Sequence, residues 1–154
     1  MQMISEESIK NILRNHDIQM NAIRHKMTEL SREKERTDAL LNALSVNADE
    51  KFYGKQYGRY LERHNKEIQT IFDKLVKEEE IIQRVWTCFY ALDEPYYSIL
   101  YALYVEQQLY KTVEAEYRWS HRIFERDRKK GIMLIQQTYY DLYNEDKEKI
   151  ISSG

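Results

Sequence analysis

Apolar residues recur in alternating steps of four and three along the first 45 residues of the chain. The series consists of Ile9, Leu13, His16, Met20, Ile23, Met27, Leu30, Lys34, Thr37, Leu41 and Leu44. This heptad spacing predicts a helix that buries one narrow stripe against a partner, with weaker packing where Lys34 and Thr37 interrupt it. Ser5, followed by Glu6 and Glu7, is a start signal for a helix over about residues 5–45.

A second series with the same spacing follows a short irregular stretch. Residues 46–56 contain Asn, Asp and Gly and have no clean period, so we expect a loop there. The series then consists of Tyr57, Leu61, His64, Ile68, Ile71, Leu75, Glu78, Ile82, Val85 and Phe89. Two such helices can bury their stripes by packing antiparallel, which predicts a long helical hairpin with coiled-coil-like packing. The stripes could instead pair between two chains of a dimer.

Shorter helices are expected in the rest of the chain. Asp93 can cap a helix and Pro95 is tolerated only in a first turn, so a helix should run from about residue 94 to residue 105. The next helix should cover about residues 109–117. Ser120 is a good N-cap for a longer helix that begins at His121.

That last helix should continue past Ile135, although Gly131 costs it about 1 kcal/mol relative to alanine. We therefore expect an all-α protein of two units. Residues 1–91 would form the helical hairpin, and residues 92–154 would form a helical bundle with a helical tail.

The composition supports helices and narrows the class of protein. The chain of 154 residues has only 4 glycines and 1 proline, too few for the many turns of an all-β fold. No stretch approaches about 18 apolar residues, and the N-terminus lacks a signal-peptide pattern, so no membrane association is expected. The single cysteine, Cys88, lies in an apolar run and is expected to be a buried thiol, which fits a reducing cytoplasm.

Charge is distributed unevenly along the chain. The net charge is -2, yet residues 110–135 contain seven Lys or Arg and four Asp or Glu. In this region a short helix, a turn at residues 118–120 and a basic helix follow one another, which is the order of a DNA-binding helix-turn-helix. Basic residues bind DNA by displacing counterions from its phosphates. A basic run on a helix is also commonly just a solvated face.

The strip from Leu92 to Ile135 carries a family resemblance. The residues that carry it are Ile99, Leu100, Tyr101, Ala102, Leu103, Tyr104, Val105, Glu106, Tyr110, Val113, Glu116, Tyr117, Trp119, Ser120, His121, Arg122, Phe124, Arg126, Lys129 and Lys130. The strip, less than a third of the chain, resembles the sigma-70 region 4-like helix-turn-helix of phage late-gene transcriptional activators of the RinA/ArpU type. The resemblance implies a small regulator that binds promoter DNA in the cytoplasm of a bacterial host cell.

The resemblance also implies which residues contact DNA. His121, Arg122 and Glu125 fall where region 4 helices face base edges. Contacts to the DNA backbone are implied for Arg126, Arg128, Lys129 and Lys130. Lys111 in the short helix and Arg118 in the turn complete the expected DNA-binding set. The chemistry fits, because Arg can bind guanine through two hydrogen bonds whereas Lys more often neutralises phosphate.

Three positions depart from the family pattern. Glu114 replaces a small residue inside the short helix and could shift its packing. Arg118 replaces a turn-forming residue, and Gln107 replaces a glycine near the end of the preceding helix. The expected core positions of the module are Val113, Tyr117, Ile123 and Phe124.

Other chemistry is expected to be absent. We interpret His16 and His64 as polar interruptions that fix helix register, and not as metal ligands. The sequence has no glycine-rich phosphate loop, nucleophile elbow or paired metal ligands, so we expect no enzyme activity, no cofactor and no metal. Six of the 13 tyrosines lie between Tyr90 and Tyr110. Core and interface packing is the favoured interpretation of them, and stacking on single-stranded nucleic acid is the alternative.

Three functions compete. The first is a sequence-specific DNA-binding regulator of phage or prophage genes, active on double-stranded DNA as a homodimer. Its hairpin would supply dimerisation or contact with RNA polymerase or another host protein. The second is a phage-encoded protein-binding inhibitor of a host factor, with a relic helix-turn-helix and a tyrosine-rich binding surface. The third is a coiled-coil scaffold. DNA binding that weakens steeply with salt would distinguish the first from the others.

Overall fold

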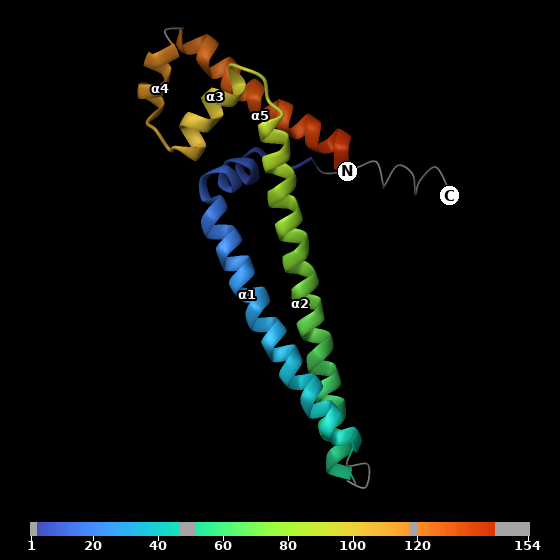
Figure 1. Ribbon diagram of the computed structural model, residues 1–154. Helices are drawn as coiled ribbons and strands as arrows, with labels where there is room; N and C mark the ends of the chain where they lie inside the picture. The colour runs from blue at the N-terminus through green and yellow to red at the C-terminus, as the bar shows by residue number, and fades with distance from the viewer. Residues whose placement is uncertain (1–2, 47–51, 118–119, 144–154) are drawn as a thin grey trace, which may run out of the picture. The chain divides into compact units, whose positions relative to one another are not determined.

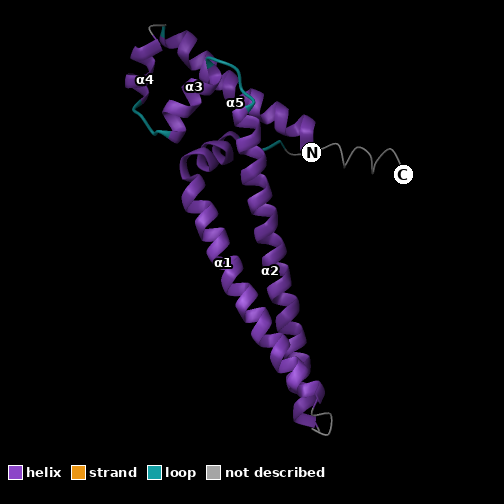
Figure 2. Cartoon of the chain, in the orientation of Figure 1, coloured by secondary structure: helices purple, strands orange, loops and turns teal. Residues whose placement is uncertain are grey.

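The computed structural model describes residues 3–46, 52–117 and 120–143, and within them every regular element is a helix. The elements, shown in Figures 1 and 2, are α1 (Glu6–Val46), α2 (Phe52–Tyr90), α3 (Tyr96–Leu100), a π-helix (Tyr101–Val105), α4 (Tyr110–Tyr117) and α5 (His121–Tyr143). The expected all-α class is confirmed. Within the described ranges, no helix combines the length and the apolarity that crossing a membrane requires.

The first long helix begins where the sequence indicates. The Ser5 hydroxyl oxygen accepts a hydrogen bond from the Ser8 backbone N–H at 3.1 Å, as an N-cap does. The buried members of the expected stripe are Ile9, Leu13, Met20, Ile23, Leu30 and Thr37. The Thr37 hydroxyl donates a hydrogen bond to the Glu33 carbonyl at 2.8 Å, whereas the Lys34 side chain is exposed. Six of the eleven positions of the expected stripe are therefore buried, and of its three polar members Thr37 is buried, His16 is partly buried and Lys34 is exposed.

A kink divides α1 near its start. Asn15 leaves the helical conformation with φ -120° and ψ 23°, and its side-chain amide donates to Asn11 Oδ1 at 2.6 Å. Two residues later the chain passes from one compact unit into another. Unit 1 consists of Met1–Asp17 and Ile81–Gly154, and unit 2 of Ile18–Glu80. These units differ from the division expected at residue 91, because the ends of both long helices pack with α3–α5.

In unit 2 the two long helices run alongside each other in opposite directions (Figure 1). His64 Nε2 lies 2.6 Å from Glu33 Oε1, and the Asn65 amide donates to Asp38 Oδ1 at 2.8 Å. Leu61 and Ile68 are buried between the helices. These contacts fix which face of α2 meets α1.

That face differs in part from the expected stripe of α2. Tyr57 and Ile71 were assigned to the buried stripe, but they are 45% and 44% exposed. Asn65 and Phe72 are partly buried instead, because the contact face is turned toward them. The expected loop at residues 46–56 was also too long: α2 already begins at Phe52, and residues 47–51 lie outside the described part.

The core of unit 1 joins the end of α2 to α3 and α5. Its fully buried side chains include Val85, Cys88, Phe89, Ile99, Leu100 and Ile135. Burial raises the pKa of the Cys88 thiol to about 11, so the expected inert, buried cysteine is confirmed. Gly131 lets α5 approach α3 closely, since a Cβ at this position would lie 3.1 Å from Leu100 Cδ1.

The helix expected over residues 94–105 is present in a modified form. It begins as the α-helix α3 and continues as a π-helix, in which the Glu106 N–H donates to the Tyr101 carbonyl at 2.8 Å. The chain then turns at Gln107, whose φ of 56° lies in the left-handed region that favours glycine. Gln107 is the position where the RinA/ArpU-type pattern has its glycine, and its backbone adopts a conformation that glycine favours.

Candidate nucleic-acid interface

α4 and α5 pack through a small aromatic core. Val113 of α4 and Phe124 of α5 are fully buried. The Tyr110 ring meets Phe124 edge-on with centroids 4.9 Å apart, and Tyr117 lies 6.0 Å from the same ring. The expected core positions Val113 and Phe124 are thus confirmed, whereas Tyr117 and Ile123 are only partly buried.

The N-terminus of α5 is capped by the residue that the sequence indicated. The Ser120 hydroxyl oxygen accepts a hydrogen bond from the Ile123 N–H at 3.3 Å, and the Ser120 carbonyl accepts one from Phe124 at 3.0 Å. These contacts fix the start of α5 at His121. Arg118, expected in the turn before it, lies outside the described residues.

Four cations share one exposed side of α5, which we call the basic face. It consists of Arg122, Arg126, Lys129 and Lys130. At 100° per residue, these positions fall within about 100° of one another around the helix axis. Arg126 and Lys129 have 68% and 62% of their side-chain surface exposed. The basic face therefore presents its charges to solvent over the first three turns of the helix.

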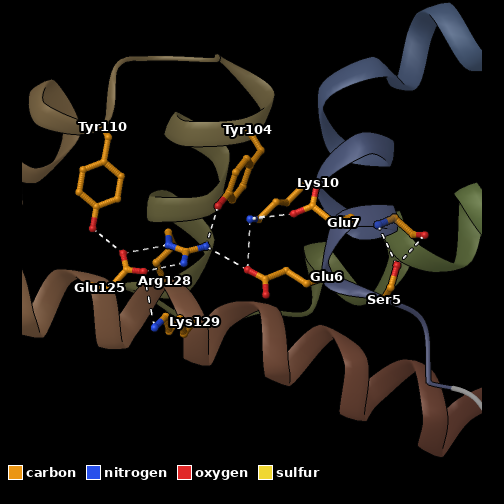
Figure 3. Close-up of polar contacts among 10 residues, drawn as sticks. Ser5, Glu6, Glu7, Lys10, Tyr104, Tyr110, Glu125, Arg128 and Lys129 are labelled. Atoms are coloured by element: carbon orange, nitrogen blue, oxygen red, sulfur yellow. Dashed lines mark hydrogen bonds and ion pairs between the residues drawn. The ribbon is translucent and has the colours of Figure 1, made fainter.

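Both acidic residues of this part of α5 are held by arginines. Glu125 accepts two hydrogen bonds from Arg128, from Nε at 3.1 Å and from Nη2 at 2.6 Å (Figure 3). Asp127 is buried, with its Oδ1 3.4 Å from Arg126 Nη2. Each carboxylate is thus paired: Asp127 with Arg126 of the basic face, and Glu125 with the buried Arg128. Lys129 Nζ also lies 3.9 Å from Glu125 Oε1 at the border of the basic face.

Arg128 occupies a different place from the one expected of a DNA-backbone contact. It is buried, and besides Glu125 its guanidinium donates to the Tyr104 hydroxyl at 2.9 Å and to Glu6 Oε1 at 3.2 Å (Figure 3). The physical reason is helical geometry, since Arg128 lies four residues after Phe124 on the apolar side of α5. Arg128 and Glu125 therefore hold the module together and are not available to DNA.

The electrostatics of this cluster follow from the same contacts. Hydrogen bonds from Arg128, outweighing burial and assisted by Tyr110, lower the pKa of Glu125 to about 2. Hydrogen bonding to Glu125 raises the pKa of Arg128. Burial and the Glu125 carboxylate raise the pKa of Tyr110, whose hydroxyl lies 2.5 Å from Glu125 Oε2. The ion pair is fully charged at neutral pH, and its charges cancel locally.

The remaining expected site residues in the described part of the chain are His121, the first residue of α5, and Lys111 of α4. His121 is exposed, and its Nδ1 lies 2.9 Å from Glu114 Oε1. Glu114, which departs from the small residue of the RinA/ArpU pattern, thus bridges α4 to the first residue of α5. Lys111 is exposed on α4. The Lys130 ammonium lies 5.5 Å from the centroid of the Tyr96 ring.

Sequence reasoning missed the partners of Arg128. Glu6 is 122 residues away in the chain, so no local pattern links the two. Tyr104 comes from the π-helix and Tyr110 from α4 (Figure 3). One signal was available, because Phe124, Arg128 and Ile132 are spaced by four residues and share one face of a helix.

No arrangement of at least three His, Cys, Asp or Glu side chains in the described residues could hold a metal ion. His16 packs edge-on against Trp86 with ring centroids 4.9 Å apart, and His64 binds Glu33. Each histidine therefore has a structural contact of its own. Comparison with protein families, with curated proteins and with solved structures gives no match for this chain.

Proposed function

We propose that the chain is a DNA-binding transcriptional regulator of phage or prophage genes, in which α4, the following turn and α5 act as a helix-turn-helix. α5 would be the recognition helix in the major groove of double-stranded DNA. The order along the chain of a helical hairpin followed by this module belongs to the same proposal. The observation that carries it is the basic face of α5, whose four cations share one exposed side of the helix while the neighbouring carboxylates Glu125 and Asp127 are paired with arginines.

The placement of charge supports this function. Cations that reach DNA phosphates release counterions and so raise the affinity for DNA. A carboxylate among these cations would repel the DNA backbone. The buried Arg128 binds Glu125, and Arg126 of the basic face lies 3.4 Å from the buried Asp127, so neither carboxylate would face the DNA without a cation beside it.

The roles within the proposed interface follow from position on α5. Arg122 lies in the first turn, where a recognition helix meets base edges, and no described residue forms an ion pair with it. Arg126, Lys129 and Lys130 lie further along and would contact phosphates. His121 would act beside Arg122, although its ring is shared with Glu114. Glu125 and Arg128 are left out of the DNA-contacting set.

The test is a fluorescence-anisotropy titration of labelled promoter DNA from the gene's own neighbourhood, at two salt concentrations. Arg122→Ala/Arg126→Ala should abolish tight binding and lower the slope of log K against log salt by about 0.9 for each phosphate that is no longer neutralised. The matched control is Arg59→Ala/Arg63→Ala on α2, which removes the same charge from two exposed positions. Equal losses of affinity in both double variants, or no binding by the folded wild type, would reject the proposal.

A second function is favoured by a different observation. Tyr90, Tyr97 and Tyr101 form a continuous row of rings, with centroids 6.5 Å and 5.8 Å apart, and Tyr90 and Tyr101 are exposed. Exposed tyrosines are common anchors of protein interfaces. The alternative is therefore a protein-binding inhibitor of a host factor that uses this row. Tyr90→Ala/Tyr101→Ala would weaken such binding and leave DNA affinity unchanged.

A further inference from the structure

A second heptad stripe lies on the surface of α2, beside the stripe that packs on α1. It consists of Tyr57, Tyr60, His64, Glu67, Ile71 and Lys74, which are spaced alternately three and four residues apart. We call it the outer stripe. Tyr60 is 59% exposed, and all six residues belong to unit 2. α1 covers the neighbouring stripe that contains Leu61 and Ile68, and of the outer stripe it contacts His64, whose Nε2 lies 2.6 Å from Glu33 Oε1.

Five of the six residues of the outer stripe are exposed, His64 is partly buried, and the rings at the start of the stripe are stacked. The rings of Tyr57 and Tyr60 stack with centroids 6.3 Å apart, and Tyr60 stacks on His64 at 6.2 Å. Along α2 these rings are followed by an acid, an isoleucine and a base at heptad positions. Heptad spacing is the pattern by which one helix packs its side chains between those of another. Rings already stacked lose little further freedom when a partner covers them.

We propose that the outer stripe is a homodimer interface, in which it pairs antiparallel with the outer stripe of a second copy of this chain. A two-fold axis makes the interface self-complementary: if one residue faces another, the reverse contact also occurs. The antiparallel direction of the two helices rests on charge. The register rests on which of the six residues face one another.

In one antiparallel register, every residue of the outer stripe faces a residue of the second copy's outer stripe. Tyr57 faces Lys74 of the second copy, Tyr60 faces Ile71, and His64 faces Glu67. The first pair places an ammonium on an aromatic ring, and the second joins Tyr60 to an isoleucine. His64 Nδ1 already lies 4.0 Å from Glu67 Oε2 of its own chain, so the third pair extends an existing contact between an acid and an imidazole across the interface. The two-fold axis repeats each pair, which gives six layers over 18 residues, or about 27 Å of helix.

The other arrangements oppose like charges or leave side chains without partners. Parallel pairing places Glu67 on Glu67 and Lys74 on Lys74. Sliding the antiparallel pair by one heptad in one direction leaves Tyr57 and Tyr60 without a partner in the stripe. Sliding it in the other direction leaves Ile71 and Lys74 without a partner in the stripe. Charge therefore selects the antiparallel direction, and the number of partnered residues selects a single register.

The first test is the mass of the full chain in sedimentation equilibrium. We expect a reversible dimer of twice the monomer's 18.8 kDa. Ile71→Arg should give the monomer mass with unchanged helicity by circular dichroism. Thr70→Arg is the matched control, because it adds the same charge to an exposed position off the stripe. A wild type that stays monomeric at every concentration would overturn the proposal, as would dimers that withstand Ile71→Arg.

Cysteine cross-linking tests the register. Tyr60→Cys/Ile71→Cys should give a disulfide-linked dimer under mild oxidation. The two positions of one chain lie about 16 Å apart along the helix, too far for an internal bridge. His64→Cys/Lys74→Cys, which would meet after the heptad slide, should remain unlinked, as should Tyr60→Cys alone. Cross-linking of either control as fast as Tyr60→Cys/Ile71→Cys would reject this register.

Discussion

Arg128 and Glu125 face each other one turn apart on the inner side of α5, joined by two parallel hydrogen bonds of 3.1 Å and 2.6 Å. The pair links three parts of unit 1, because Arg128 also binds Tyr104 and Glu6. An arginine in a fork geometry with a carboxylate is rigid as well as charged. The pair therefore fixes how α5 sits on the π-helix and on the start of α1.

Removing the guanidinium should destabilise the fold. We expect Arg128→Ala to lower the free energy of unfolding by about 3 kcal/mol, because it leaves carboxylates without their buried partner. Arg122→Ala removes the same group from the solvent side of α5 and should change stability by less than about 0.5 kcal/mol. Urea unfolding followed by circular dichroism measures both. Similar values for the two variants would show that the buried network contributes little.

The stability of the protein should depend on pH through Glu125. Its pKa falls from the ordinary 4.5 to about 2 on folding, chiefly because Arg128 hydrogen bonds to it. A lowered pKa stabilises the fold above the ordinary value, and this contribution disappears as the pH falls toward the folded pKa. The stability difference between wild type and Glu125→Gln should therefore shrink from pH 6 to pH 3. A difference that is constant over this range would contradict the assignment.

A side chain at Gly131 should cost stability despite its better helix propensity. Alanine favours a helix by about 1 kcal/mol over glycine, but its Cβ would lie 3.1 Å and 3.3 Å from Leu100 Cδ1 and Cγ. Leu100 is fully buried and cannot move freely, so overpacking should give a net loss of about 1 kcal/mol.

A double-mutant cycle identifies the interaction behind this loss. Leu100→Ala removes the atoms that Gly131→Ala would meet, so the two changes together should cost about 1 kcal/mol less than their sum. Thermal or urea unfolding of the four proteins gives the coupling. Strict additivity would mean that Leu100 does not limit the approach of α5 to α3.

The turn after the π-helix should prefer glycine. Gln107 has φ 56°, a conformation that is costly for any residue with a Cβ. Gln107→Gly should be more stable than Gln107→Ala by about 1 kcal/mol, and the alanine variant controls for removal of the hydrogen bond to the Arg14 carbonyl. Chemical unfolding of both variants is the measurement. An alanine variant at least as stable as the glycine variant would contradict this account.

The sequence predicts the elements of this fold better than their mutual contacts. Most of the stripe of α1 from Ile9 to Thr37 is buried as expected, with Lys34 exposed, because a single apolar series dominates that helix. In α2 two heptad series run side by side. Tyr57 and Ile71 belong to the one that faces solvent, and periodicity alone does not say which series meets α1.

In the candidate site too, the local features follow from the sequence, whereas the contacts between distant residues do not. The N-cap at Ser120 and the core residue Phe124 follow from local rules, and the structure has both. Arg128 was grouped with Lys129 and Lys130 because the three are adjacent in sequence, although adjacent helical residues point about 100° apart. Its partner Glu6 comes from the opposite end of the chain, where no spacing rule connects them.

The N-terminal segment lies along α5, with Glu6 bound to Arg128 and the Ile4 carbonyl accepting a hydrogen bond from Gln136 at 2.9 Å. These partners are 122 and 132 residues apart in the chain. On the ribosome, the first turn of α1 must therefore remain unpaired until α5 has left the exit tunnel, while α1 and α2 can already assemble. Contacts of such long sequence separation form slowly and late. A nascent or truncated chain that lacks α5 would keep its long helices, and the first turn of α1 would stay undocked.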